Sequence, residues 1–272
     1  MGRLSVANVF SVDVEDYFQV EAFSSIVRPE EWERFPSRVE ANTDRVLQLM
    51  ARKGVHGTFF VLGWVARRYP GVVRAIAAQG HEIASHGLSH RLIYLQTPEL
   101  FRRETLESKA LLEDQCQQPV IGYRAATYSI TRKSLWALDV LCDAGFLYDS
   151  SIFPVWHDKY GIPDALRLPH RMRTPLGNEI VEFPITVLER AKMRIPIAGG
   201  GYFRLFPYAF TRWALGAVNR EGHDFVFYIH PWEVDPDQPR MQDAALLSRF
   251  RHYLNLRRCE QRLECLLGDF PF

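Results

Sequence analysis

Acidic residues and histidines that could bind a metal occur at two separate places in the chain. Asp13, Glu15 and Asp16 lie together in the segment SVDVEDYF. His86 and His90 follow later, four residues apart in the segment SHGLSH. Two histidines and one carboxylate, with a fourth position left open, are a common ligand set of catalytic zinc. Because a second, unbound carboxylate can act as a general base, the two segments predict metal-assisted hydrolysis.

Each segment also has a plainer interpretation. Surface helices produce the spacing of the two histidines by chance, and three acids after a strand can form a solvated turn. The HExxH motif of zincins is not formed, because His86 follows His81 by five positions. A cation would relieve the repulsion between the crowded carboxylates, which favours the metal interpretation.

The elements that must position these residues alternate between strand and helix. Hydrophobic alternation and β-branched residues predict strands in the segments ANVFSVDV, HGTFFVLGW, HEIASH, VIGYRAA, FLYDSS and DFVFYIHPWE. Between them we expect helices, one capped by Asn42 or Thr43 and ended by Gly54, and another capped by Thr97. This alternation predicts parallel β/α units, and a chain of this length suits one α/β barrel domain.

Polar residues cluster where these strands end. Five of them come at or just after the carboxyl end of a predicted strand, namely Asp13, His86, Arg124, Asp149 and His230. In a parallel barrel the carboxyl ends of the strands form the active-site face. Core packing gives no reason for such a placement, so we expect these side chains to converge on a site.

Composition excludes several classes of protein. The chain has 272 residues, 47% of them hydrophobic, and a formal net charge of +1, so it lacks the basic bias typical of nucleic-acid binding. Its four cysteines form no CxxC pair, which argues against a disulfide framework or a zinc knuckle. Neither a secretory signal nor a transmembrane stretch is evident, so we expect a cytoplasmic location, with peripheral membrane attachment as an alternative.

Taken in order, these motifs resemble those of polysaccharide deacetylases of the NodB-homology type, carbohydrate esterase family four. The matching segments are SVDVEDYF, the run from His86 to His90, RAATYS and FYIHPWE. The whole-chain pattern, including GGGYFR, is most similar to the exopolysaccharide deacetylases that accompany exosortase systems. The resemblance implies an α/β fold: a single-domain distorted (β/α) barrel of about seven parallel strands. It would span residues 1–272, with a loop insertion near 17–40 and a helical extension near 240–272.

The resemblance also implies catalytic roles. Asp13 would be the general base, Arg124 would pair with it and keep it ionised, and His230 would be the general acid that protonates the leaving amine. The backbone N–H of Tyr128 would help to stabilise the oxyanion. Trp232 adjoins the general acid in the sequence and is the aromatic residue that we expect to stack on a sugar.

A divalent metal ion, expected to be Zn²⁺, is implied as cofactor, with His86 and His90 as ligands. The third ligand is either Glu15 or Asp16, and we prefer Asp16 because aspartate is the usual ligand type of the family. The motif RAATYS lacks the proline that is common in the family, and Gly87 stands where Ser or Thr is commoner.

The expected function is removal of N-acetyl groups from N-acetylhexosamine units of an exopolysaccharide. The expected partners are a polysaccharide or oligosaccharide substrate and membrane-associated synthesis or export machinery, with no nucleic acid. One alternative is an allantoinase-like hydrolase of a small cyclic amide or ureide, which the divided acidic motif permits. The other is an inactive carbohydrate-binding relative.

Overall fold

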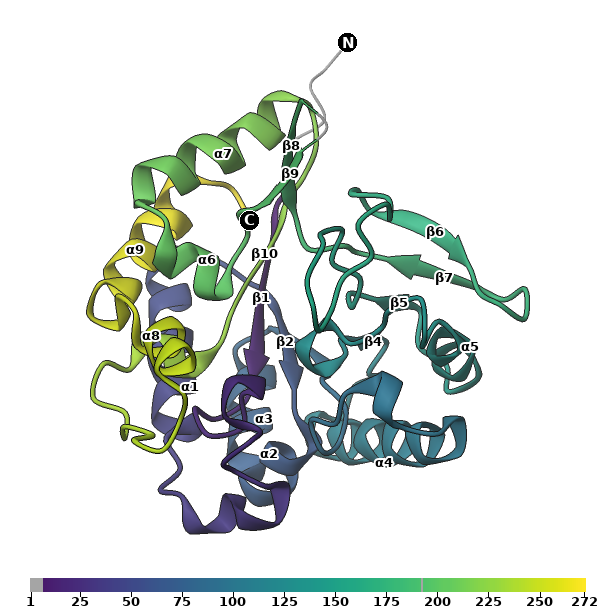
Figure 1. Ribbon diagram of the computed structural model, residues 1–272. Coiled ribbons are helices and arrows are strands. Elements are labelled where there is room, and N and C mark those ends of the chain that lie inside the picture. Colours follow the sequence, from purple (N-terminus) through teal and green to yellow (C-terminus); the bar gives the residue numbers. More distant parts are fainter. Residues whose placement is uncertain (1–6, 192) are drawn as a thin grey trace.

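The computed structural model describes residues 7–191 and 193–272, and one curled, eight-stranded sheet organises them (Figure 1). Its order is β10-β1-β2-β3-β4-β5-β7-β6. The strands are β1 (Val9–Val14), β2 (Thr58–Val61), β3 (Glu82–Ser85), β4 (Gly122–Tyr123), β5 (Tyr148–Asp149), β6 (His170–Arg173), β7 (Glu179–Glu182) and β10 (Val226–Ile229). All neighbours pair in parallel except β6, which is antiparallel to β7. The predicted α/β fold is confirmed, as an open half-barrel.

Helices connect the parallel strands and cover the sheet. They are α1 (Val39–Lys53), α2 (Gly63–Arg68), α3 (Pro70–Ala78), α4 (Pro98–Cys116), α5 (Trp136–Asp143), α6 (Gly200–Leu205), α7 (Tyr208–Arg220), α8 (Leu246–Tyr253) and α9 (Leu256–Asp269). Figure 1 shows α4 and α5 beside β4 and β5, and α6 and α7 near β10. A separate hairpin consists of β8 (Val187–Arg190) and β9 (Met193–Pro196). Among the described helices, none combines the length and the apolar character that spanning a bilayer requires.

The central strand β1 explains why the sheet places its polar residues at one end. The strand pairs with β2 on one side and β10 on the other, and every residue from Phe10 to Val14 is buried. A strand that is covered on both faces must be apolar along most of its length. Polar groups are therefore concentrated at the carboxyl end of β1, where Asp13 lies opposite Phe60 of β2.

The start of α1 differs from the prediction. The helix begins at Val39, before Asn42 and Thr43, so neither of these residues is its cap. The Oδ2 atom of Asp16 instead accepts hydrogen bonds from the backbone N–H groups of Arg38 (2.9 Å) and Val39 (3.2 Å). A carboxylate at a helix N-terminus satisfies free N–H groups and interacts favourably with the helix dipole. Sequence patterns missed this cap because it comes from a distant segment.

Two other helix ends agree with the prediction. Gly54 follows α1 with a φ of 64°, a left-handed conformation that favours glycine. The side chain of Thr97 caps α4 by accepting a hydrogen bond of 3.2 Å from the N–H of Leu100. These ends could be predicted because each depends on residues next to the helix in the chain.

Two segments outside the regular β/α units border the carboxyl end of the sheet. Residues 17–38 contain two short 3-10 helices, η1 (Glu21–Phe23) and η2 (Pro29–Arg34). Trp32 of η2 packs edge-on against Trp64 of α2, with ring centroids 5.5 Å apart. Phe23 of η1 contacts His252 of α8, with centroids 4.6 Å apart. The N-terminal segment and the C-terminal helices therefore meet at the end of the sheet where the predicted site residues lie.

Candidate active site and metal centre

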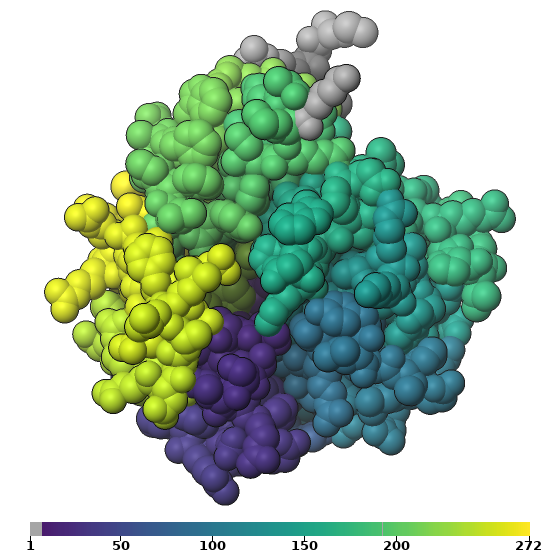
Figure 2. All heavy atoms as spheres, viewed as in Figure 1, coloured from purple at the N-terminus to yellow at the C-terminus, as the bar shows by residue number. Residues whose placement is uncertain are grey.

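The carboxyl ends of the strands bring most of the predicted site residues into one hollow of about 210 Å³. The residues from the prediction that line it are Asp13, Glu15, His86, His90, Tyr128, His230 and Trp232. In Figure 2, N-terminal residues in purple, middle residues in teal and C-terminal residues in green and yellow meet around a central depression. Parallel strands that end at the same edge of the sheet produce this convergence.

Glu15, His86 and His90 form a group that could hold a metal ion. One ligand atom from each residue can be chosen so that all three lie within 4.8 Å of one another. Glu15 follows β1, and the two histidines follow β3, so the group joins the loops after two strands that flank β2. Two imidazoles and one carboxylate match the ligand types of a catalytic zinc site.

A hydrogen bond prepares His86 to be a metal ligand. Its Nδ1 lies 2.8 Å from the carbonyl oxygen of Arg124. Because a carbonyl only accepts, Nδ1 must carry the proton and Nε2 must have a free lone pair. Burial lowers the pKa of His86 to about 4, so the ring is neutral near pH 7. A backbone carbonyl that fixes the tautomer of a ligating histidine is typical of metal sites.

Glu15 supplies the second observation that fits a metal. Its Oε2 atom is buried, lies 2.6 Å from Nε2 of His90, and yet makes no hydrogen bond of acceptable geometry with any described residue. Burial raises the pKa of Glu15, but the neighbouring His90, His230 and His86 outweigh that effect and lower it to about 2. A buried, ionised oxygen without a hydrogen-bond donor is costly unless a cation satisfies it.

The structure does not bring Asp16 to the histidines. Besides capping α1, its Oδ2 accepts a hydrogen bond of 2.7 Å from Ser37, and its Oδ1 accepts one of 3.0 Å from the N–H of Tyr17. Both oxygens of Asp16 therefore accept hydrogen bonds from the backbone and from Ser37, and Asp16 is not part of the group formed by Glu15, His86 and His90. The structure therefore gives no support to our preference for Asp16 as the third ligand, and it places the alternative, Glu15, beside the two histidines.

Asp13 and Arg124 form a buried ion pair next to this group. Nη1 of Arg124 lies 2.6 Å from Oδ1 of Asp13, and both side chains are almost fully buried. Ser11 and Ser150 accept further hydrogen bonds of 2.9 Å from the guanidinium, which lies 3.9 Å from the ring centroid of Phe60. The guanidinium is thus held in place from several sides and can keep the Asp13 carboxylate in one orientation.

His230 faces Glu15 from the opposite side of the hollow. Its Nε2 lies 3.5 Å from Oε1 of Glu15, and its Nδ1 lies 3.2 Å from Oε2 of Glu233. Burial alone would lower the pKa of His230, but the hydrogen bond to Glu233 and the charges of Glu15 and Glu233 raise it to about 9. The raised pKa keeps both ring nitrogens protonated near pH 7. Because Glu233 accepts the Nδ1 proton, the Nε2–H group is directed toward Glu15 and the hollow.

Sequence reasoning missed the residues that hold His230. Arg204 of α6 donates a hydrogen bond of 2.6 Å from Nε to Glu233, and its Nη1 donates to the carbonyl of His252 at 2.7 Å. Arg204, Glu233 and His230 therefore form a hydrogen-bonded chain in which Arg204 and Glu233 are buried. The contact between Glu233 and His230 could have been predicted, because Glu233 follows His230 by three residues at the start of a short helical turn, which is the spacing of a capping box. Arg204 is far away in sequence and gave no signal.

Two predicted substrate-contacting groups are placed differently from the expectation. Trp232 is stacked between His230, at 5.1 Å, and His252, at 4.2 Å, so neither face is free for a sugar. The backbone N–H of Tyr128 donates to the carbonyl of Ala125 at 3.1 Å and is not free for an oxyanion. The preceding residue, Thr127, also lines the hollow, and its N–H has no hydrogen-bond partner in the described chain.

Gly87, the departure from the usual family motif, has a conformational reason. Its φ of 76° is left-handed, and an added Cβ would lie 3.2 Å from the hydroxyl of Tyr123. A left-handed backbone favours glycine over residues with a side chain. The last residue of the loop, His90, also has a positive φ of 55°. The loop Gly87–His90 turns sharply in this way and directs both histidines toward Glu15.

A buried pair of carboxyl groups lies below Arg124. Asp149 of β5 and Glu182 of β7 are neighbours across the sheet and are fully buried. Burial raises the pKa of Asp149 to about 6, and burial together with the charge of Asp149 raises that of Glu182 well above its ordinary value. The pair therefore retains protons in the folded protein at a pH where the unfolded chain releases them.

Replacing Glu182 with glutamine is expected to make stability less dependent on pH. In the wild-type protein the pair contributes fully to the free energy of unfolding below the unfolded-state pKa of about 4. This contribution is lost as the pH rises through the raised pKa values that the two carboxyl groups have in the folded state. The variant should gain about 2 kcal/mol of stability near pH 8 and nothing near pH 4. Thermal unfolding followed by circular dichroism across this range measures the effect. Equal pH slopes for both proteins would contradict it.

Two family models and several curated proteins are similar to parts of the chain. Residues 32–143 match a family model described as polysaccharide deacetylase, and residues 150–272 match one described as a domain of unknown function, DUF3473. A chitooligosaccharide deacetylase from Rhizobium leguminosarum bv. trifolii is 33% identical over 99 residues, which is 36% of this chain and 43% of the relative. A peptidoglycan-N-acetylglucosamine deacetylase from Bacillus cereus is 28% identical over 79 residues, which is 29% of this chain and 37% of that relative. The chain thus spans less than half the length of these curated relatives.

Solved structures agree on the fold. A protein from Mycobacterium smegmatis that is described as a polysaccharide deacetylase superposes with a TM-score of 0.63 at 19% identity, over 98% of this chain and 85% of that chain. Puue allantoinase superposes with a TM-score of 0.61 at 17% identity, over 98% and 86% of the two chains. The half-barrel is thus shared by proteins whose names indicate different substrates. The family model and the curated relatives agree with the resemblance: residues 32–143 are similar to polysaccharide deacetylases.

Proposed function

We propose that this protein is a metal-dependent hydrolase that removes N-acetyl groups from the hexosamine units of a polysaccharide. The observation that carries the proposal is the arrangement of three functional parts around one hollow: the group Glu15, His86 and His90, the Arg124-paired Asp13, and His230 on the other side. A metal-type ligand set with separate acid and base groups is what metal-assisted amide hydrolysis requires. The names of the curated relatives support the substrate class.

Glu15, His86 and His90 would hold the ion, which we propose to be zinc. When bound there, the ion supplies Lewis-acid activation of water and of the amide carbonyl. The hydrogen bond from His86 to the carbonyl of Arg124 orients that imidazole before any ion binds. Arg124 thereby links the proposed metal ligands to the proposed base, because its guanidinium also holds Asp13.

Asp13 would act as the general base. One of its oxygens is held by Arg124, which leaves the carboxylate able to accept a proton from the attacking water. His230 would act as the general acid, with Nε2–H donating a proton to the amide nitrogen as the C–N bond breaks. Water and the N-acetyl group are thus converted to acetate and a free amine. The N–H of Thr127, in place of that of Tyr128, would stabilise the negative oxygen.

We also propose how many domains the chain forms, which polysaccharide it acts on and which machinery it works with. The segments matched by the two family models would form one domain, because β1 pairs on one side with β2 of the first segment and on the other side with β10 of the second. An exopolysaccharide is the proposed substrate, and the proposed setting is membrane-associated synthesis or export machinery. Both rest on the resemblance of the sequence to deacetylases of exosortase systems.

Acetate release from N-acetylglucosamine oligomers tests the proposed reaction. We expect release by the purified protein, loss of release after treatment with a chelator, and recovery when zinc or another divalent ion is added back, because the proposed ligands are buried and need an ion. A heat-treated sample is the control for non-enzymatic release. Release that persists in the chelated, metal-free protein would contradict the proposal. Hydrolysis of allantoin by metal-free protein would indicate the cyclic ureide alternative.

A further inference from the structure

Helix α8 turns its apolar side chains away from the protein. Leu246 is 79% exposed, Leu247 is 59% exposed and Phe250 is 58% exposed. The one buried residue of the helix is a histidine, His252, whose ring stacks on Trp232 with centroids 4.2 Å apart. A surface helix ordinarily directs its apolar residues toward the core and its polar residues toward solvent. In α8 this arrangement is reversed.

The exposed apolar residues of α8 lie together on one side of the helix. At 3.6 residues per turn, Leu246, Leu247 and Phe250 fall within a sector of about 100°. Arg249 borders one edge of this sector and Arg251 borders the other. We call these five residues the α8 face. An apolar strip with basic residues at its borders is typical of helices that lie in the interface of a bilayer.

The chain around the α8 face is strongly basic. Residues 240–258 contain five arginines, and Asp243 is their only acidic residue. None of these five guanidinium groups forms an ion pair with a carboxylate in the part of the chain that the structure describes. A guanidinium group without such a partner can form two parallel hydrogen bonds with a phosphate. Anionic lipid headgroups therefore complement this surface in charge.

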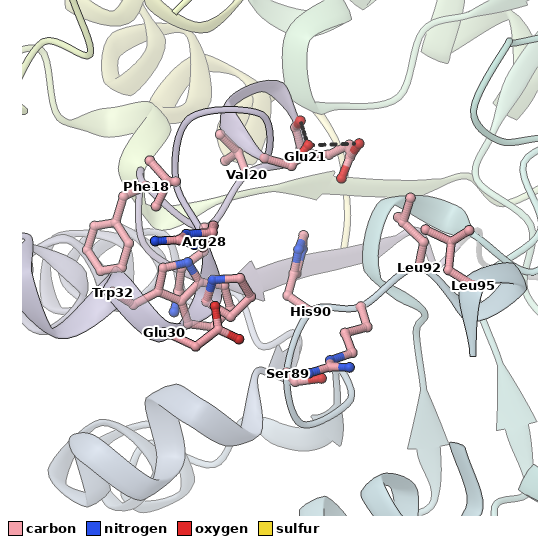
Figure 3. A pocket seen from close by; sticks show the side chains of 15 residues that line it. Phe18, Val20, Glu21, Arg28, Glu30, Trp32, Ser89, His90, Leu92 and Leu95 are labelled. Carbon is pink, nitrogen blue, oxygen red and sulfur yellow. Dashed lines mark hydrogen bonds between the residues drawn. The ribbon is translucent and has the colours of Figure 1, made fainter. Parts of the chain in front are cut away.

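The two hollows near the proposed site do not explain why these apolar side chains are exposed. Besides the catalytic hollow, a second one of about 440 Å³ lies beside His90, between residues of the segments 18–32 and 89–95 (Figure 3). Leu246, Leu247 and Phe250 line neither of the two. A ligand bound in either hollow would therefore leave the α8 face uncovered.

Self-association is also disfavoured as a way to cover the α8 face. In a symmetric dimer the same surface patch of both copies meets. Two copies joined through this face would bring their unpaired arginines together, and placing like charges side by side in an interface is costly. A surface of opposite charge removes this repulsion, which favours an anionic partner over a second copy of the chain.

The α8 face lies beside the catalytic hollow. Arg251 and His252 of the helix line that hollow. Figure 1 shows α8 on the outside of the molecule, on the side opposite to β6 and β7. A membrane in contact with α8 would therefore be close to the hollow in which the proposed reaction occurs.

We propose that α8 docks the protein on the surface of a membrane that contains anionic phospholipid. Leu246, Leu247 and Phe250 would enter the boundary between headgroups and acyl chains, and Arg249 and Arg251 would contact lipid phosphates. The helix would lie in the plane of the interface, because its eight residues are too few to cross a bilayer. This inference goes beyond the proposed reaction and does not depend on it, because docking requires neither a metal nor a sugar.

Co-sedimentation with lipid vesicles tests the docking. We would compare the wild type, Leu246→Ser/Phe250→Ser and the control Leu166→Ser/Leu176→Ser on vesicles of phosphatidylcholine mixed with phosphatidylglycerol. Leu166 and Leu176 lie outside α8 and are 62% and 80% exposed, which is similar to the exposure of Phe250 and Leu246. We expect the α8 variant to bind at least about tenfold more weakly than the wild type, because two inserted apolar side chains are lost. The control should bind like the wild type.

Arg249→Gln tests the contribution of charge separately. Removing one basic residue near an anionic surface should weaken binding to the mixed vesicles by about fivefold. Binding to vesicles of phosphatidylcholine alone should be weaker for the wild type and unchanged by this substitution. Added salt should weaken wild-type binding to the mixed vesicles, because ions screen the attraction. Thermal unfolding followed by circular dichroism verifies that each variant is folded.

Three outcomes decide the inference independently of the proposed reaction. It is wrong if the wild type does not bind the mixed vesicles, or if Leu246→Ser/Phe250→Ser binds them equally well. A wild-type dimer that this variant converts to a monomer in analytical ultracentrifugation would assign the α8 face to self-association instead. If the wild type binds vesicles through the face but releases no acetate with any divalent ion, the docking is supported and the proposed reaction fails.

Discussion

Asp13→Asn is expected to lower kcat for acetate release by about 10³-fold. The amide of asparagine cannot accept a proton from water, whereas its oxygen can still accept the hydrogen bond from Arg124 that is 2.6 Å long in the native protein. The variant should therefore fold and keep its metal content. Initial rates at saturating oligomer measure the effect, and metal analysis of the same sample verifies the ligand group.

Ser11→Ala is the matched control for this variant. Ser11 also accepts a hydrogen bond from Nη1 of Arg124, at 2.9 Å, but it has no group that could serve as a base. Losing this bond costs roughly 1 kcal/mol and should lower kcat by less than about tenfold. If both variants lost activity equally, the role of Asp13 would be to hold Arg124, and the general base would have to be another residue.

The second large effect, on metal binding, is expected when the adjacent acids Glu15 and Asp16 are replaced one at a time. Glu15→Gln should weaken divalent metal binding by at least about 100-fold, because removal of a ligand exceeds the effect of removing an outer partner. Asp16→Asn should retain the metal and lower the free energy of unfolding by about 1–2 kcal/mol, because it weakens the cap of α1. Metal content after dialysis and thermal unfolding measure the two effects.

The pair is informative because the two residues are neighbours with different partners. Glu15 has a buried oxygen without a hydrogen bond, whereas the oxygens of Asp16 accept hydrogen bonds from Ser37 and from backbone N–H groups. Loss of metal from Asp16→Asn together with retention by Glu15→Gln would reverse our assignment. In that case the loop after β1 would have to rearrange when the ion binds.

Local patterns were sufficient for most of the fold. The alternation in β1, the Thr97 cap and the glycine after α1 depend on residues within a few positions of one another, and the structure agrees with each. The expectation of about seven parallel strands came from the family resemblance, and seven strands of the described sheet run parallel. The start of α1 could not be predicted in this way, because Asp16 caps it across an intervening loop.

The candidate site, like the fold, has features that local sequence patterns predict and features that depend on long-range contacts. The sequence by itself determined which kinds of groups are present and that they follow strand ends, so Asp13, His86, His90, Arg124 and His230 could be named in advance. Parallel strands then bring those ends together, whatever lies between them in the chain. The gathering of these side chains at one edge of the sheet was therefore predictable from residue types and their order.

Contacts between distant segments of the folded protein determine which atoms are free to act. The tertiary structure directs Asp16 to a helix end, covers both faces of Trp232 with histidines, and leaves an oxygen of Glu15 without a hydrogen bond. It also places Arg204 behind Glu233 and opens a second hollow beside His90. The physical reason is that a polar group is available for binding or catalysis only when no other part of the fold satisfies it. That depends on contacts between residues far apart in the sequence.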